Sequence, residues 1–204
     1  MAAASSPTLT SAIASLQTGV FVNGAFVTPP ATFEVVSGAT GAALARCPLA
    51  DAALADAACS AAAAAFGPWS RTAPAERAGW LRKLADELER RKDEVASVEA
   101  ANTSKPFREA QGDVDDACAA FRYCASHAEA LGEGRLLATA PTGMPAAEFA
   151  GSSIRYEPLG VVAAICPFNF PRWYSHCCRA YPFLCKCILL TLATSGTPFA
   201  CLQS

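Results

Sequence analysis

"GVVAAICPFNFP", residues 160–171, is the stretch that decides the fold of this chain. Its first part, residues 160–166, is apolar without interruption. A short run of this kind predicts a strand that is buried on both faces, as in a parallel α/β sheet. In such sheets ligands bind beyond the carboxyl ends of the strands, which is where residues 167–171 lie. Two prolines stiffen this turn, and Asn169 places a neutral amide in it.

Asn169 allows two interpretations. A neutral amide can donate a hydrogen bond to a developing oxyanion, an interaction worth roughly 3 kcal/mol where the donor is pre-aligned. The alternative is that Asn169 only caps the turn through its backbone. Physical reasoning on the turn alone favours the second interpretation.

The composition is that of a globular chain of 204 residues, long enough for one domain or for part of a larger one. Apolar residues make up 52% and charged residues 17%, which excludes a disordered polymer. The net charge of -2 gives no reason to expect nucleic acid or an anionic membrane as a partner. Residues 1–18 read as a disordered leader, and residues 187–202 are too interrupted for a membrane span. We therefore expect a cytoplasmic protein.

The residues before 160 predict helices set between short strands. Asn23-Gly24 is a tight-hairpin signal, because both residues tolerate positive φ. Asp51 is a candidate N-cap for the first helix. The charged run at residues 89–94 predicts a solvated helix face, not a nucleic-acid patch. The expected elements are strands at 21–22, 26–27, 33–36, 136–137 and 154–156, and helices at 51–66, 72–101 and 105–131.

Ten cysteines are unevenly placed, five of them within the last 33 residues. Their spacing lacks the paired C-x-x-C pattern of a structural zinc site, so we expect no metal. Cys118 and Cys124 follow the apolar steps of a helix and read as small core residues, not as nucleophiles. His127 has no partner that the sequence identifies.

Four stretches resemble the N-terminal part of the aldehyde dehydrogenase family. They are "VFVNGAFV" with the turn after it, "AAFGPWSRTAPAERAGWLRKLADELERRKDEVASVEAANTSKPFREA", "GDVDDACAAFRYCASHAEAL" and "YEPLGVVAAICPFNFP". The third leans toward the betaine and aminoaldehyde branch, and the resemblance covers roughly residues 19–171. It has departures: Ser37-Gly38 stands where the family usually has Asn-Pro, Ser104 where glycine is usual, and Phe168 where tryptophan is commoner.

The resemblance implies an α/β fold: an incomplete Rossmann-like domain that binds NAD or NADP, with a β oligomerisation hairpin. It implies oxidation of an aldehyde substrate to a carboxylic acid in a homo-oligomer. Asn169 matches the family's oxyanion-stabilising asparagine, and Ile165, Pro167 and Phe168 match residues on the nicotinamide side of the pocket. The implied divisions are 19–135 for the first part of the cofactor domain, 136–156 for the hairpin, 157–171 for the first Rossmann strand and its turn, and 172–204 for an atypical tail.

The sequence changes character at Arg172. Residues 172–204 hold five cysteines and no Asp or Glu, whereas the first 171 residues hold all 18 acidic residues. The resemblance implies that a lysine-ended strand, a glutamate base and a nucleophilic cysteine follow, and we expect none of them here. A change of reading frame or splicing at Arg172 is one hypothesis, and divergence is the other. Two functions stay open: a truncated family enzyme that is inactive by itself, or a non-catalytic fragment that docks on full-length subunits.

Overall fold

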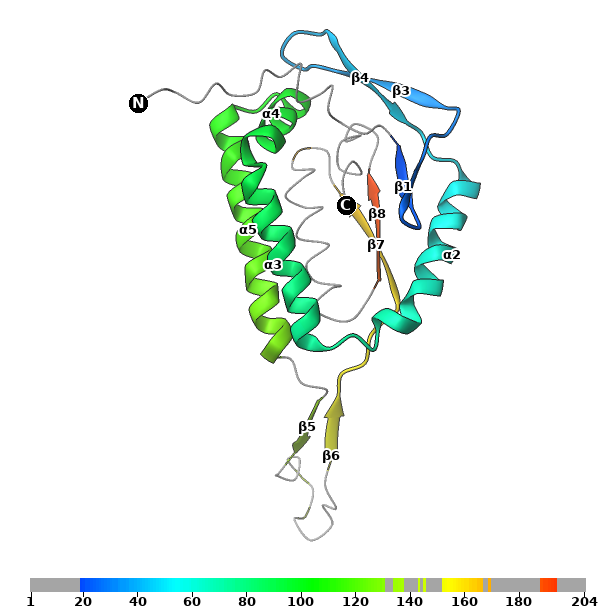
Figure 1. Ribbon diagram of the computed structural model, residues 1–204, viewed down its shortest axis with the longest axis vertical. Helices are drawn as coiled ribbons and strands as arrows, with labels where there is room; N and C mark the ends of the chain where they lie inside the picture. Colours follow the sequence, from blue (N-terminus) through cyan, green and yellow to red (C-terminus); the bar gives the residue numbers. More distant parts are fainter. Residues whose placement is uncertain are drawn as a thin grey trace.

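A computed structural model describes residues 19–130, 134–137, 143, 145, 152–166, 169 and 188–193. Three helices form one side of the molecule, and a fourth helix with most of the strands forms the other (Figure 1). Residues 1–18 and most of the tail lie outside the described residues. The elements, in chain order, are β1 Val20–Val22, β2 Ala25–Val27, β3 Thr32–Val36, β4 Ala43–Pro48, α2 Ala52–Trp69, α3 Pro74–Arg90, α4 Lys92–Thr103, α5 Phe107–Ala130, β5 Gly134–Leu137, β6 Ser152–Arg155, β7 Val161–Cys166 and β8 Ile188–Ala193.

The first two strand pairs are antiparallel hairpins. β1 and β2 turn through Asn23 and Gly24, whose φ angles of 51° and 80° confirm the predicted tight turn. Phe21 lies opposite Phe26 in the register, and their rings meet edge to face at 5.0 Å. β4, which the sequence did not identify, pairs with β3 and leads through residues 49–51 into α2.

α2 begins where the sequence predicts. The Asp51 carboxylate accepts a hydrogen bond of 2.8 Å from the Leu54 N–H, as an N-cap does. The expected end at Phe66 is wrong, because the helix continues through Pro68 to Trp69. Proline removes one donor from the last turn, but the Ser70 N–H still reaches the Phe66 carbonyl at 2.8 Å and closes it.

The single helix expected over residues 72–101 is instead two helices, α3 and α4. The chain leaves helical geometry at Arg91, where φ is -102° and ψ is 18°. The change of direction keeps Val95 in the main core while Val98 turns toward the β3–β4 hairpin. Apolar periodicity runs across Arg91 almost unchanged, so the sequence gives no sign of the break.

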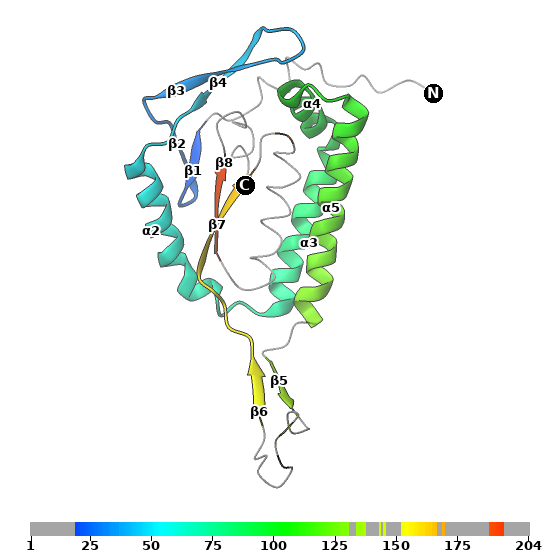
Figure 2. The same ribbon diagram turned by 180° about the vertical axis from the view of Figure 1, so that it is seen from behind.

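α3 and α5 lie side by side and form the main core (Figure 2). Leu81, Ala85 and Leu88 of α3 meet Val114 and Phe121 of α5, all within one cluster of buried side chains. Cys118 and Cys124 belong to the same cluster, as the sequence predicts. On the outer surface of α5, His127 does have a partner: its ring lies 4.0 Å from that of Tyr123, and its Nδ1 is 2.9 Å from the Tyr123 carbonyl.

Ion pairs between α3 and α5 run along the edge of this core. Arg82 bonds Glu129 at 2.9 Å, and Arg122 bonds Asp86 at 3.1 Å and Glu89 at 2.5 Å. The hydrogen bond and the charge of Arg82 lower the pKa of the Glu129 carboxyl below its ordinary value. The ionised form of Glu129 is therefore favoured by packing α3 against α5.

Acid should weaken this helix pair through Glu129. A lowered carboxyl pKa contributes stability above the unfolded pKa of glutamate, about 4.3, and that contribution is lost as pH falls through the lower folded value. Between about pH 7 and about pH 3 the parent should lose more unfolding free energy than Glu129→Gln, measured by urea titration with circular dichroism. The difference should disappear in an Arg82→Ala background. If the unfolding free energies of the parent and of Glu129→Gln depend equally on pH, the Arg82–Glu129 pair does not contribute to the acid sensitivity of the helix pair.

The N-cap of α2 gives a second prediction. Asp51→Ala should destabilise the folded chain by about 1 kcal/mol, because it removes the acceptor of the Leu54 N–H. Asp51→Asn keeps an acceptor oxygen and should cost only a small part of that. Denaturant midpoints of the two variants give the comparison, and equal losses would mean that charge near the helix, not capping, is what matters.

Candidate functional site

The candidate site lies at the carboxyl end of β7. β7 pairs with β8 in parallel, in the register from Val161 opposite Ile188 to Cys166 opposite Ala193. Both strands therefore end at the same edge (Figure 1). Open α/β sheets bind their ligands beyond this edge. The parallel arrangement predicted from residues 160–166 is present.

β8 corrects the expectation for the tail. The sequence predicted an atypical tail over residues 172–204. Residues 188–193, "ILLTLA", nonetheless supply a parallel neighbour. They form a run of apolar and β-branched side chains, a signal that could have been found. β8 carries no lysine.

One face of β7 is buried and the other is open. Ala164 and Cys166 are 7% and 0% exposed, whereas Ile165 between them is 68% exposed. α2 contacts both β7 and β8. The prediction of a strand buried on both faces is therefore wrong for this chain. The apolar run is therefore no sign of burial on both faces, because Val161 and Ile165 lie on the exposed face.

The four predicted site residues fall into two groups. Ile165 is the last outward-facing residue of β7, and Asn169 lies three residues beyond the strand in an exposed bend. Pro167 and Phe168 lie outside the described residues. The structure thus places Ile165 and Asn169 at the edge where ligands of parallel sheets bind. Both residues are exposed, Ile165 with an apolar side chain and Asn169 with an amide.

Thiols in the described residues are poor candidates for nucleophiles. Burial raises the pKa of Cys47 to about 11 and also raises the pKa of Cys118. An activated cysteine needs the opposite, a lowered pKa from a nearby cation or helix N-terminus. Cys124 and Cys166 are 1% and 0% exposed. Among the described residues, no group of three or more His, Cys, Asp or Glu side chains could hold a metal ion.

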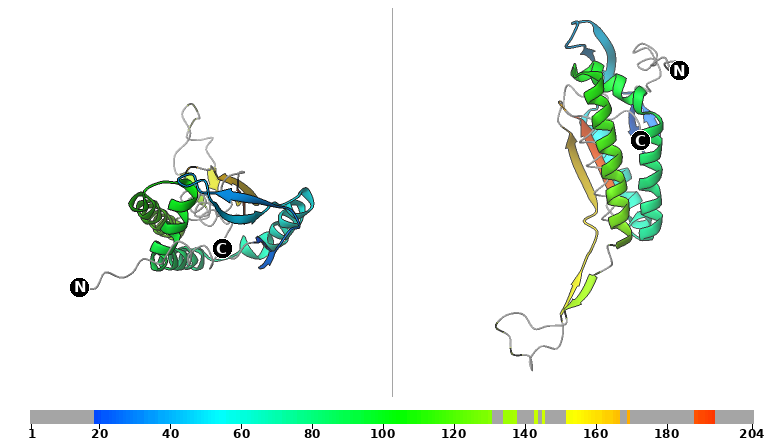
Figure 3. Two further views of the ribbon diagram at one scale, coloured as in Figure 1. Left: turned by 90° about the horizontal axis from the view of Figure 1, so that it is seen from above. Right: turned by 90° about the vertical axis from the view of Figure 1, so that its left-hand side faces the viewer.

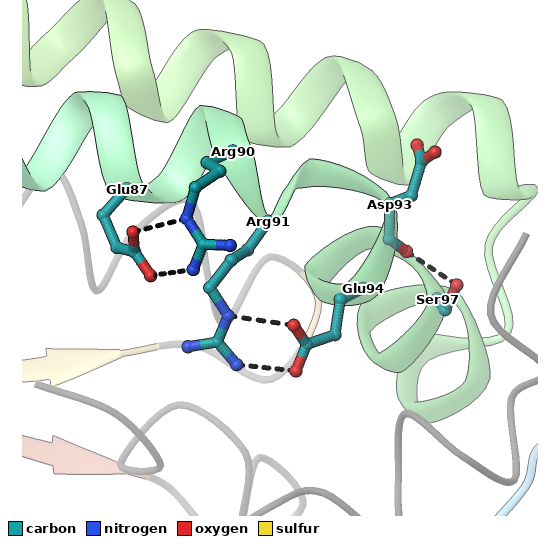
Figure 4. Close-up of polar contacts among 6 residues, drawn as sticks. All are labelled: Glu87, Arg90, Arg91, Asp93, Glu94 and Ser97. Atoms are coloured by element: carbon teal, nitrogen blue, oxygen red, sulfur yellow. Dashed lines mark hydrogen bonds and ion pairs between the residues drawn. The ribbon is translucent and has the colours of Figure 1, made fainter.

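The charged run at residues 89–94 lines a shallow depression where α3 meets α4. Figure 4 shows its side chains engaged with near neighbours: Glu87 bonds Arg90 and Arg91 bonds Glu94, both at 2.6 Å. Ser97 donates to the Asp93 carbonyl at 2.7 Å. These are i,i+3 and i,i+4 contacts of a solvated helix surface, which confirms the sequence interpretation.

A buried polar group escaped the sequence analysis. Lys105, at the turn between α4 and α5, bonds Glu99 at 3.3 Å and Asp113 at 2.6 Å, and these three side chains are 11%, 2% and 16% exposed. Nearby in sequence, the buried amide atoms of Asn102 have no hydrogen-bond partner within the described residues. The only sequence signal was a lysine inside an otherwise neutral turn, "NTSKP". This group holds the turn between α4 and α5.

Comparison with known proteins gives a consistent result. The model of the aldehyde dehydrogenase family matches residues 26–203. Aminoaldehyde dehydrogenase 2 of Zea mays is 38% identical over 160 residues, which are 75% of this chain and 31% of that protein. Betaine aldehyde dehydrogenase of Staphylococcus aureus, solved with NAD+, has a TM-score of 0.84 at 23% identity and covers 94% of this chain and 38% of its own. PnpE of Pseudomonas sp. WBC-3, solved with NAD, has a TM-score of 0.78 at 32% identity over 87% of this chain and 36% of its own.

These likenesses confirm the predicted α/β fold and extend its range. The chain spans about a third of the length of these relatives. The family match continues to residue 203, so the expectation that the resemblance stops near residue 171 is wrong. β8 lies within the matched range even though the composition of residues 172–204 departs from that of the first 171 residues. Among the described helices, none has the length and hydropathy needed to cross a membrane.

Proposed function

The chain belongs to the aldehyde dehydrogenase family, and on that premise we propose that its chemistry is NAD(P)+-dependent oxidation of an aldehyde to the carboxylic acid. The observation that carries the proposal is Asn169, an exposed amide at the carboxyl edge of two parallel strands. In this reaction a thiolate adds to the aldehyde, a hydride leaves for the nicotinamide, and water hydrolyses the resulting thioester. An amide donor stabilises the oxyanion that forms when the thiolate adds.

The 204-residue chain does not complete this reaction by itself. Asn169 can donate a hydrogen bond but can neither attack a carbonyl nor remove a proton. Of the described cysteines, Cys59 on α2 is exposed and the others are buried. Burial raises the pKa of Cys47 and Cys118, which disfavours the thiolates that the first step needs. This chain therefore supplies the scaffold and one oxyanion donor.

The cofactor that we propose is NAD or NADP, which accepts the hydride when bound. Ile165 faces outward at the end of β7 and gives the flat, apolar contact that a nicotinamide ring needs. Pro167 and Phe168 follow it in the chain, and we assign both to the same wall by their match to the family pattern. PnpE, a relative solved with NAD, supports the cofactor class.

The substrate and the cellular location are proposed from the names of the relatives and from the cysteines, not from the geometry of the site. The names of the relatives in Zea mays and Staphylococcus aureus favour an aminoaldehyde or betaine aldehyde as the substrate. We place the protein in the cytoplasm. Cys47, Cys59 and Cys118 are free thiols, which fits a reducing compartment, where disulfides are rare.

The partner that we propose is a second family subunit, bound through the hairpin of β5 and β6. These strands pair antiparallel with each other, from Gly134 opposite Arg155 to Leu137 opposite Ser152. The hairpin extends away from the rest of the molecule (Figure 3). A two-stranded ribbon is marginally stable in water, so a partner strand or surface would stabilise it. The domain divisions at 19–135, 136–156, 157–171 and 172–204 are part of this proposal.

A non-catalytic role is the second candidate. The same hairpin, with Tyr156 and Leu159 exposed beyond it, would dock this chain on full-length subunits. Co-expression with a full-length relative distinguishes the two roles. Mixed oligomers with reduced activity per subunit would favour docking, and complete absence of mixed oligomers would exclude it.

Purified 1–204 should not reduce NAD+ or NADP+ with betaine aldehyde, an aminoaldehyde or a simple aliphatic aldehyde. The reason is that, within the part of the chain that the structure describes, neither an activated thiol nor a base lies at the β7 edge. The measurement is absorbance of the reduced cofactor against a blank without protein. Turnover that disappeared on mutation of a single cysteine would contradict the prediction and identify the nucleophile.

Asn169 is tested in a longer chain that carries family sequence after Pro171 and is active. Asn169→Ala should lower kcat by about 10²–10³-fold, because one oxyanion donor is lost, while cofactor affinity changes little. Asn169→Asp, similar in size but without the amide donor, should be at least as slow. A kcat within twofold of the parent for Asn169→Ala would make this residue a turn residue only.

A further inference from the structure

The β3–β4 hairpin is held together internally far better than it is attached to the helices. Its register runs from Thr32 opposite Pro48 to Val36 opposite Ala43, with one irregularity after Val35. The Arg46 guanidinium donates two hydrogen bonds across the strands to the Thr32 hydroxyl, at 3.2 and 2.9 Å. The Leu49 N–H donates to the Ala31 carbonyl at 2.8 Å and closes the open end. Such a hairpin moves as one body.

Its attachment to the helical side is small. A second buried cluster, separate from the main core, contains Val35 and Cys47 of the hairpin and Val98 of α4. Val98 is the only helical member of this cluster within the described residues, and it is 1% exposed. Elements with few buried apolar contacts open at lower free energy than the core that surrounds them. The hairpin has this character, whereas α3 and α5 share a much larger cluster.

A close contact lies at the rim of the attachment. A Cβ added at Gly38, in the turn of the hairpin, would meet the Ser104 Oγ at 2.5 Å and the Ser104 Cβ at 3.4 Å. Ser104 ends α4 with its backbone in the left-handed region, at φ of 61°. This conformation, uncommon for a residue other than glycine, sets the direction of its side chain. Only glycine at position 38 leaves room for this hydroxyl in its present position.

We propose that the β3–β4 hairpin is a strap that undocks from α4 as a unit before the helical core opens, and that the fit of Gly38 against Ser104 controls this opening. The strap joins two parts of the molecule, because β4 continues through residues 49–51 into α2, and α2 contacts β7 and β8 (Figure 1). Undocking therefore loosens the link between the helices and the strands that carry the candidate site. This inference is independent of the proposed aldehyde chemistry.

Cysteines in the parent sequence report each kind of opening. Cys47 is 0% exposed in the attachment cluster, Cys118 and Cys124 are buried in the main core, and Cys59 is exposed on α2. A thiol reagent labels a buried cysteine only while the surrounding structure is open. The full chain is labelled with iodoacetamide, and mass spectrometry of each cysteine peptide measures the labelling rate of each of these four cysteines separately.

Cys47 should label more slowly than Cys59 and at least about tenfold faster than Cys118 and Cys124, a ratio that corresponds to 1.4 kcal/mol of opening free energy. Equal rates for Cys47, Cys118 and Cys124 would overturn the proposal, because the strap would then open only with the core. Labelling of Cys47 as fast as Cys59 would also overturn it, because the strap would not be docked at all.

A double-mutant cycle tests the control by Gly38. Gly38→Ala should raise the Cys47 labelling rate by about three- to tenfold in the parent, since the new Cβ displaces the Ser104 hydroxyl. The same change should have no effect in a Ser104→Ala background, which removes the Oγ and keeps the Cβ. Unchanged rates at Cys118 and Cys124 show that each variant remains folded. An equal effect of Gly38→Ala in both backgrounds would mean that the contact does not control the strap.

Discussion

The close packing of α3 against α5 is the contact on which the rest of the described structure depends. Ala85, Ala117 and Ala125 are almost completely buried at this contact, so the two helices approach closely enough for Leu81 and Phe121 to fill the remaining space. Alanine buries little area per residue, and the stability of the pair therefore comes from tight fit more than from large side chains. Every other described element lies at the ends or on one side of this pair.

A buried ionic group fixes the far end of the pair. Lys105 lies between the carboxylates of Glu99 and Asp113, and so joins the last turn of α4 to the first turns of α5. Because these charges are buried, removing one partner leaves another buried charge without compensation, which destabilises the folded chain. The direction of α4, and with it the position of Val98 against the β3–β4 hairpin, follows from this arrangement.

The candidate site depends on the opposite side of the molecule. α2 lies against β7 and β8, so Ala164 and Cys166 are buried while Ile165 faces outward. A parallel pair of strands presents both carboxyl ends at one edge, and the turn at Asn169 follows directly. An aliphatic side chain, Ile165, and an amide, Asn169, thus both lie near the carboxyl end of β7.

The sequence by itself determined much of the local structure, including the strand at whose end the candidate site is proposed. The turn at Asn23-Gly24, the cap at Asp51, the helices around 72–131 and the strand ending at Cys166 all follow from short-range signals: positive φ, a capping oxygen and apolar periodicity. The tertiary structure alone decided the break at Arg91, the burial of Glu99 and Lys105, the exposed face of β7 and the use of residues 188–193 as its neighbour. Each of these depends on which surface lies opposite a residue. That is set by contacts between segments far apart in the chain, and an apolar run reads the same whether one of its faces is covered or both.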